Sequence, residues 1–315
     1  MNKPKAVIGT NSWGGKAYGK LIRGSYVDNS VIKEAMQTAK ELGLDVYDLA
    51  RDYGFGKAQK MIGEFGTEDI VISAKYTPFK RYKKGCVRSS LEKDLADFRR
   101  DYVDIYWLHL PIDVKEHLQE IIELYNEGRI RHIGVSNFDL DECKLSKEIL
   151  SSAGIPLFGV QNHYSIISRE WEINGLLDWC RDNGVQFWAW AVLEEGMLTD
   201  PRIKTKFSPM KLMMYSQKYK MRELYKVMIA VGKRHGISVP QVAEAFCASK
   251  GVVPICGCRK PKQVMELSQA ADIQLSPGEI KALEKAADRS QAKVLGADIF
   301  RFYVPKKGDR HGENS

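Results

Sequence analysis

The chain has 315 residues, more than an average single domain but within the range that barrels reach as one domain. Its composition, with 44% hydrophobic and 28% charged residues, excludes a disordered protein and a coiled coil. The formal net charge of +8 helps to attract an anionic ligand but is only a weak indication of nucleic acid, so we expect no nucleic-acid partner.

Nowhere does the sequence contain eighteen consecutive apolar residues, and its first residues hold no apolar run of signal-peptide length. We therefore expect a cytoplasmic protein with no membrane contact. The six cysteines include no CxxC pair, which favours reduced thiols. Cys256 and Cys258 have no His or Cys nearby to complete a metal site, so we expect buried small residues and no metal.

Short apolar, β-branched runs alternate with longer amphipathic stretches along the chain. Eight runs are predicted as strands: Lys5–Thr10, Leu44–Ala50, Asp69–Lys75, Tyr102–His109, Ile130–Asn137, Pro156–His163, Val185–Ala191 and Val252–Gly257. The helical pattern predicts helices over Asn29–Leu42, Lys57–Glu64, Val87–Arg99, Val114–Asn126, Leu140–Ser151, Glu170–Asn183, Tyr219–Arg234, Pro240–Ser249 and Pro261–Ala271.

Eight strands that are each followed by a helix predict a closed parallel α/β barrel, the (β/α)8 or TIM barrel. Parallel strands need crossover connections, and closure removes the exposed strand edges. A doubly wound open sheet is the alternative. No linker divides the chain, so we expect one barrel domain over 1–287 and a tail over 288–315 near its mouth. The long segment Leu193–Lys218 is expected to serve the site as well.

Polar residues end three successive strands of the predicted barrel. Two-residue alternation points Asp48, Lys75 and His109 to the interior at the carboxyl ends of their strands, and Tyr53 follows on a loop over the same mouth. Asp48 and Lys75 would compensate each other's buried charge. The ammonium would favour the phenolate of Tyr53, which makes that tyrosine a usable general acid, and His109 would orient a substrate oxygen. Taken singly, each residue also fits a purely structural role.

These segments resemble the aldo-keto reductase superfamily over nearly the whole chain. Asp48-Leu49-Ala50 with Tyr53-Gly54 resembles the DxA…YG segment of that family, and the runs that end in Lys75 and His109 resemble its third and fourth strands. The resemblance implies that Asp48, Tyr53, Lys75 and His109 are the catalytic tetrad. It also implies a barrel without the N-terminal hairpin of many members, because only a few residues precede the first strand.

The segment Gly128–Phe138 looks like the most recognisable motif of the family and implies NADPH as the cofactor. Its Ser-Asn pair and a glutamine on the next strand would hold the nicotinamide carboxamide, and an aromatic ring on the seventh strand would stack on the nicotinamide. A turn before the helix Pro261–Ala271 would hold the adenosine phosphate. The cofactor residues implied by the resemblance are Gly9, Thr10, Asn11, Asp48, Ser136, Asn137, Gln161, Trp190, Leu193, Gly196, Arg259 and Gln263.

The substrate side of the site is the part that the resemblance defines least. We expect a small carbonyl compound in contact with Trp13, Tyr53, Trp107 and His109, lined further by aromatic residues that include Phe300, Phe302 and Tyr303 of the tail. His163 is interpreted as a residue behind the site. Leu267 stands where the family often has an asparagine that reaches the adenine, so the adenine contacts are expected to differ.

The predicted function is therefore NADPH-dependent reduction of an aldehyde or ketone to an alcohol by hydride transfer, with tyrosine as the proton donor, in a monomer or weak oligomer. A nicotinamide-binding regulatory subunit with slow turnover is the alternative, since channel-associated β subunits resemble the same superfamily. A phosphate-binding barrel without nicotinamide is a third possibility. Turnover of a generic aldehyde and binding of NADPH distinguish the three.

Overall fold

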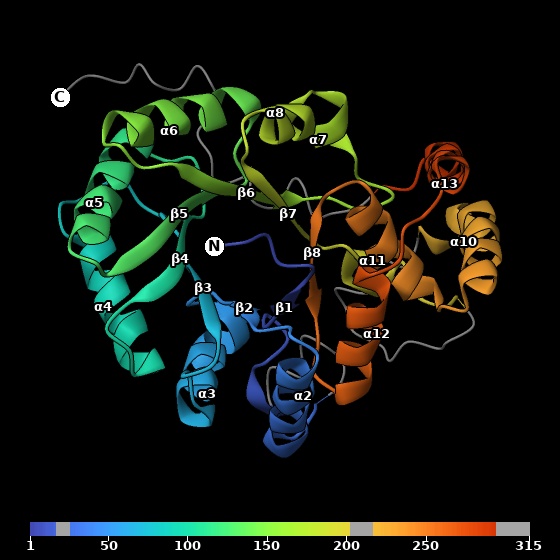
Figure 1. Cartoon of the computed structure of the whole chain (residues 1–315), viewed down its shortest axis with the longest axis horizontal. Coiled ribbons are helices and arrows are strands. Elements are labelled where there is room, and N and C mark those ends of the chain that lie inside the picture. The colour runs from blue at the N-terminus through green and yellow to red at the C-terminus, as the bar shows by residue number, and fades with distance from the viewer. Residues whose placement is uncertain (17–25, 202–216, 294–315) are drawn as a thin grey trace.

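Eight parallel strands form a closed barrel in the order β1 to β8, and Figure 1 shows them as a ring inside the helices. The computed structural model describes residues 1–16, 26–201 and 217–293. The strands are β1 (Val7–Gly9), β2 (Val46–Asp48), β3 (Val71–Tyr76), β4 (Val103–Leu108), β5 (Ile130–Ser136), β6 (Leu157–His163), β7 (Gln186–Trp190) and β8 (Val253–Gly257). The closed barrel confirms the predicted fold and excludes the open sheet.

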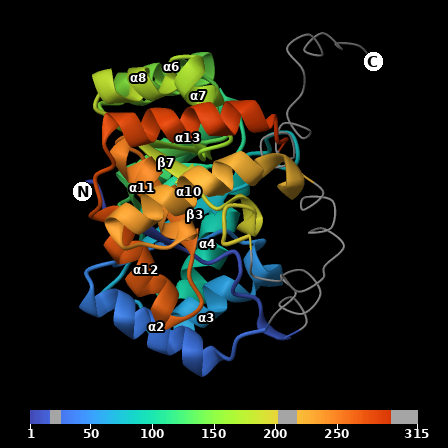
Figure 2. The same cartoon turned by 90° about the vertical axis from the view of Figure 1, so that its right-hand side faces the viewer.

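The helices surround the barrel and bury its outer face. They are α2 (Asn29–Glu41), α3 (Lys57–Phe65), α4 (Cys86–Phe98), α5 (Val114–Asn126), α6 (Leu140–Ser152), α7 (Glu170–Ile173), α8 (Leu176–Asp182), α10 (Arg222–His235), α11 (Val239–Ser249), α12 (Pro261–Ala271) and α13 (Pro277–Ser290). Helix α12 packs against α2 and thereby closes the ring of helices, while α10 and α13 lie side by side outside α11 (Figures 1 and 2).

Two stretches differ from the predicted elements. The helix expected over Glu170–Asn183 is interrupted between α7 and α8, because Gly175 has a φ of 84° and a left-handed residue ends a helical turn. Helix α13 was not predicted. It begins with a capping box in which Ser276 accepts from the backbone N–H of Glu279 and the Glu279 side chain accepts from the backbone N–H of Ser276.

The barrel interior is filled by large side chains that point inward from alternate positions of the strands. Trp107 of β4 is one of these side chains, and its indole lies against Gly134 of β5 and Gly159 of β6. A Cβ on Gly134 would lie 2.3 Å from Trp107 Cε3, and a Cβ on Gly159 would lie 3.2 Å from Cη2 of the same ring. These two glycines therefore make room for the indole directly below the mouth.

The residues before β1 were expected to lack the N-terminal hairpin. No hairpin precedes β1 within residues 1–16; instead the Lys3 ammonium donates to the carbonyl of Gly251 and Lys5 forms an ion pair with Asp272.

Part of the segment Leu193–Lys218, and the tail aromatics Phe300, Phe302 and Tyr303, lie outside the described residues. Within the described ranges, no helix has both the length and the apolar character that a membrane crossing requires.

Candidate active site

Asp48 and Lys75 form a buried ion pair at the carboxyl ends of β2 and β3. Lys75 Nζ lies 2.5 Å from Asp48 Oδ1 and also donates to the carbonyl oxygen of Leu49 over 3.2 Å. Gln161 Nε2 of β6 donates to the same Asp48 oxygen over 2.8 Å. Burial lowers the pKa of Lys75, and the adjacent carboxylate opposes that shift. The expected ion pair is therefore present, and three strands converge on one carboxylate.

Tyr53 lies beside this pair, in the 3-10 turn η1 (Tyr53–Gly56) that follows β2. Its hydroxyl donates to Asp48 Oδ2 over 3.4 Å, and Lys75 Nζ lies 5.1 Å from the centre of its ring. The turn depends on Gly54, which has a φ of 61°, because a Cβ there would lie 1.9 Å from the carbonyl oxygen of Trp13. The glycine after Tyr53 thus allows the phenol to reach the ion pair.

His109 follows β4 and is buried at the same mouth. Its Nδ1 lies 2.7 Å from Thr77 Oγ1, a hydroxyl on the loop after β3. Burial, together with the ammonium of Lys75, lowers the pKa of His109 to about 3. The imidazole is therefore neutral at physiological pH and is available for hydrogen bonding without carrying a charge.

The expected amide-binding residues cluster between β5 and β6. Ser136 Oγ donates to the carbonyl oxygen of Gln161 over 2.7 Å, and Asn137 Nδ2 donates to the carbonyl oxygen of His109 over 3.0 Å. Asn137 has a φ of 63°, in the left-handed region that asparagine tolerates better than most residues. Asn137 Oδ1 accepts a hydrogen bond from Trp190 Nε1 over 3.2 Å. Serine, asparagine, glutamine and tryptophan are thus brought together with the ion pair.

Trp190 ends β7 and is half-buried, with one ring face covered by a histidine. The ring centroids of Trp190 and His163 lie 4.7 Å apart at an interplanar angle of 23°, which is a stacked geometry. The chain then turns through η2 (Glu194–Gly196); of the expected cofactor residues, Leu193 precedes this turn and Gly196 ends it. His163 therefore lies behind Trp190, as the sequence suggested.

The other expected cofactor residues follow β1 and β8, which are neighbouring strands of the barrel: Thr10, Asn11, Arg259 and Gln263. Thr10 donates to the carbonyl oxygen of Asp48 through both its hydroxyl and its N–H, and the side chain of Asn11 is exposed. Gln263 Oε1 accepts from the backbone N–H of Arg259 over 3.0 Å, so this glutamine orders the turn before α12. The structure therefore places these residues at one side of the mouth.

A buried hydroxyl without a partner lies in this region. Gly9 and Gly257 are register partners on β1 and β8, and a Cβ on Gly257 would lie 3.5 Å from Ser12 Oγ. Ser12 Oγ is buried and has no hydrogen-bond partner among the described residues. A buried hydroxyl without a partner is costly, and a bound polar group such as a phosphate or a ribose would satisfy it.

Two aromatic residues lie deeper than the sequence analysis expected. Trp13 is 1% exposed and donates from Nε1 to the carbonyl oxygen of Cys258 over 2.8 Å, while Trp107 is 0% exposed and donates to Ser73 Oγ over 2.7 Å. Both indoles are buried, although they were expected to contact a substrate. Leu267, on α12, is also fully buried and belongs to the hydrophobic core.

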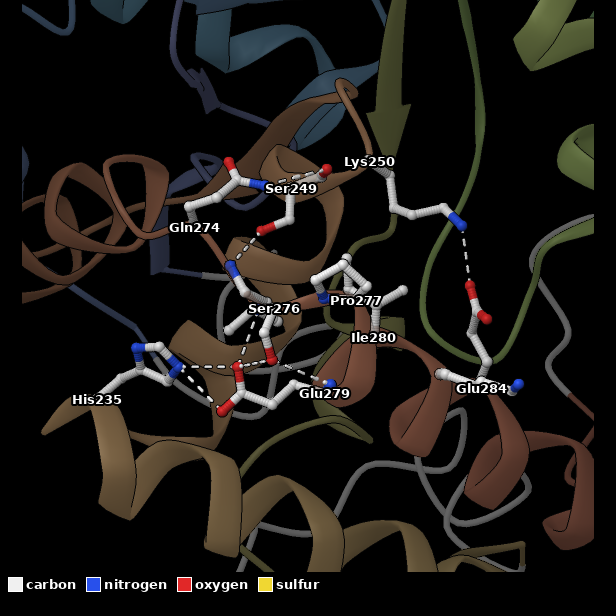
Figure 3. A pocket seen from close by; sticks show the side chains of 11 residues that line it. His235, Ser249, Lys250, Gln274, Ser276, Pro277, Glu279, Ile280 and Glu284 are labelled. Carbon is white, nitrogen blue, oxygen red and sulfur yellow. Dashed lines mark hydrogen bonds and ion pairs between the residues drawn. The ribbon is translucent and has the colours of Figure 1, made fainter.

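A cavity of about 660 Å³ lies on the outer face of the molecule, between α10, α11 and α13 (Figure 3). Its polar groups bind one another: His235 Nε2 lies 3.1 Å from Glu279 Oε1, and Ser276 Oγ donates to Glu279 Oε2 over 2.8 Å. None of the tetrad residues lines it. This cavity is therefore separate from the candidate active site.

Three polar residues at the site were not singled out from the sequence: Ser12, Thr77 and Glu194. Each follows the end of a strand, at a position where a polar residue is also ordinary loop composition. The only signal in the sequence that could have found these residues is their position soon after a strand end, and many loop residues share that position. The described residues include no cluster of three or more His, Cys, Asp or Glu side chains arranged to hold a metal ion.

Comparison with known proteins adds a family to this geometry. Residues 5–288 match the model of the Aldo/keto reductase family. The chain is 25% identical to the aldo-keto reductase YhdN of Bacillus subtilis, over 93% of this chain and 91% of that protein. It superposes on the thermostable aldo-keto reductase Tm1743, bound to the inhibitor epalrestat, with a TM-score of 0.74, 27% identity and coverage of 91% and 96% of the two chains. An aldo/keto reductase from Klebsiella pneumoniae, in complex with NADP and acetate, gives a TM-score of 0.68 at 24% identity, over 90% of each chain.

Proposed function

Because the chain belongs to the aldo/keto reductase family, whose members are NAD(P)-dependent oxidoreductases, we propose that it reduces the carbonyl group of a small aldehyde or ketone, with NADPH as cofactor and Tyr53 as proton donor. The observation that carries this proposal is the convergence of the Tyr53 hydroxyl, the Asp48–Lys75 ion pair and the neutral His109 at one barrel mouth. The NADP complex of the Klebsiella relative supports the choice of cofactor.

The residues of the mouth fit a nicotinamide cofactor. Ser136, Asn137 and Gln161 offer the hydroxyl and amide groups that a carboxamide requires, and Trp190 offers a flat ring. Ser12 Oγ lies close to Gly257, four residues before α12 begins, and the N-terminus of a helix favours a phosphate. When bound, NADPH supplies the hydride that the carbonyl carbon accepts.

Each residue of the tetrad then has one task. Tyr53 transfers its hydroxyl proton to the carbonyl oxygen, and the Lys75 ammonium stabilises the negative charge left on the phenol oxygen. Asp48 holds Lys75 in place and compensates its charge. His109 is neutral, and when the Thr77 hydroxyl donates to Nδ1 the imidazole proton resides on Nε2, from which it donates to the substrate oxygen.

Turnover of a nitrobenzaldehyde, followed through the absorbance of NADPH, tests the proposal. Consumption of NADPH in step with alcohol formation is expected. Tight binding of NADPH with negligible turnover would favour a regulatory subunit, and the absence of NADPH binding would favour a phosphate-binding barrel. Sedimentation of the purified protein tests the predicted monomer or weak oligomer.

A further inference from the structure

Behind the site, a carboxylate and an imidazole form a buried hydrogen-bonded pair. Both carboxylate oxygens of Glu194 lie near His163 Nε2, at 3.0 and 3.1 Å, and Ser165 Oγ donates to Glu194 Oε1. The exposed fractions are 1% for Glu194 and 2% for His163. A buried carboxylate is costly unless it is hydrogen-bonded, and His163 and Ser165 hydrogen-bond the carboxylate oxygens of Glu194.

The pair joins the end of β6 to the turn that follows the neighbouring strand β7. His163 ends β6, whereas Glu194 lies in the turn after β7, where it has a φ of 45°. Ala191 and Glu195 in the same turn also have positive φ, at 59° and 52°. Non-glycine residues adopt this region only when the surrounding structure holds them there. The buried hydrogen bonds of Glu194 supply such a restraint.

The imidazole of this pair also supports the indole of Trp190. His163 and Trp190 are register partners on β6 and β7, so their side chains point to the same side, and their rings stack at 4.7 Å. Asn137 Oδ1 holds the edge of the indole through Nε1. One face and one edge of Trp190 are therefore fixed by protein groups.

We propose that Glu194, acting through His163, is a positioning residue for Trp190. The carboxylate fixes the imidazole, and the imidazole fixes the plane of the indole on which the nicotinamide stacks. This inference rests on the proposed function, because it takes Trp190 as the nicotinamide platform. Neither Glu194 nor His163 contacts the reacting atoms, so their effect is on cofactor affinity and on the geometry of hydride transfer.

The chain contains a matched control with the same chemistry in another place. On the outer cavity, Glu279 is paired with His235 Nε2 at 3.1 and 3.2 Å and accepts a hydrogen bond from Ser276 Oγ (Figure 3). Both carboxylates therefore combine a histidine with a serine. Replacing Glu279 by alanine also removes its ion pair with Arg234 and its bond to the Ser276 backbone N–H, so the control loses more bonds than Glu194→Ala does, but only the Glu194 set reaches Trp190.

The test measures NADPH affinity by nucleotide fluorescence, with thermal unfolding of each variant in parallel. Glu194→Ala is expected to weaken NADPH binding about tenfold, whereas Glu279→Ala lowers the melting temperature and changes affinity less than about twofold. Glu194→Gln keeps the shape and is expected to stay within about threefold of wild type. In a Trp190→Ala background, Glu194→Ala is expected to add less than about twofold, because a residue that acts through the indole has nothing left to position.

Unchanged NADPH affinity in Glu194→Ala would overturn the inference, and so would a full tenfold loss in the Trp190→Ala background. If Glu194→Ala does not fold, the double variant His163→Leu/Glu194→Leu replaces the pair by apolar residues and tests the same loss of affinity. A wild-type protein that binds no NADPH would show that the proposed function is wrong, whereas a binding wild type with an equally binding Glu194→Ala would overturn this inference alone.

Discussion

Lys75 lies two residues beyond Ser73 on β3, and Ser73 is the register partner of Asp48 on β2. The Lys75 side chain consequently bends back toward β2, so that Nζ lies 2.5 Å from Asp48 Oδ1. The whole Lys75 side chain is buried. Ser73 adds a hydrogen bond to the same carboxylate and receives one from Trp107. The ion pair thus rests directly on the packed interior of the barrel.

The first prediction concerns the proton donor. Tyr53→Phe removes the hydroxyl and keeps the ring, so carbonyl reduction should fall about 10²- to 10⁴-fold while NADPH affinity stays close to wild type. Single-turnover decay of NADPH absorbance and a binding titration measure the two quantities. Wild-type kcat with chemistry rate-limiting would mean that another group gives the proton.

The second prediction concerns the ion pair. Lys75→Met leaves the Asp48 carboxylate buried without its cation, so the free energy of unfolding should fall by about 3–5 kcal/mol. Asp48→Asn in the same chain removes the uncompensated charge and should restore part of that loss, without restoring activity. Urea unfolding of both variants measures this. Equal stabilities of the single and double variants would contradict the assignment of the loss to buried charge.

The third prediction concerns the floor of the site. Gly134→Ala places a Cβ 2.3 Å from the Trp107 ring, and this overpacking should cost about 1–3 kcal/mol of unfolding free energy. Gly278→Ala in α13 is the control, because its Cβ meets nothing within 4 Å and it should be neutral or stabilising. In a Trp107→Leu background Gly134→Ala should cost less than it does in the wild type, and an unchanged cost would place the strain elsewhere.

The fourth prediction concerns pH. Burial raises the pKa of Glu244, which is 5% exposed, to about 8 from the usual 4.5. Between these values the folded chain keeps a proton that the unfolded chain loses, so the Glu244 contribution to stability is present below pH 4.5 and is lost as pH rises toward 8, at up to about 1.4 kcal/mol per pH unit. Glu244→Gln should therefore gain stability over wild type as pH rises from 5 to 8. A constant difference across that range would contradict a raised pKa.

The fifth prediction concerns the choice of cofactor. Arg259 stands at the turn before α12, and a guanidinium matches the 2′-phosphate that distinguishes NADPH from NADH. Arg259→Ala should weaken NADPH binding about ten- to hundredfold and change NADH binding little. Equal losses for both nucleotides would mean that Arg259 contacts a part of the cofactor that they share.

The sequence by itself determined the strand order and the identity of the interior groups at the strand ends. Two-residue alternation depends only on neighbours in the chain, so Asp48, Lys75 and His109 were predicted to face one mouth and do so. Glycines that follow helices are equally local signals: Gly43 and Gly236 both have a φ of 68°, the left-handed conformation that ends a helix.

Only the tertiary structure decided which groups touch across the barrel. Gln161 reaches Asp48 from 113 residues away, and Glu194 reaches His163 because the turn after β7 folds back over β6. Trp107 is buried because Gly134 and Gly159 of other strands make room for its indole, and the buried Trp13 donates to the carbonyl oxygen of Cys258 after β8. Such contacts depend on barrel stagger and on turn dihedrals that many residues set together, and no local pattern of residue types records them.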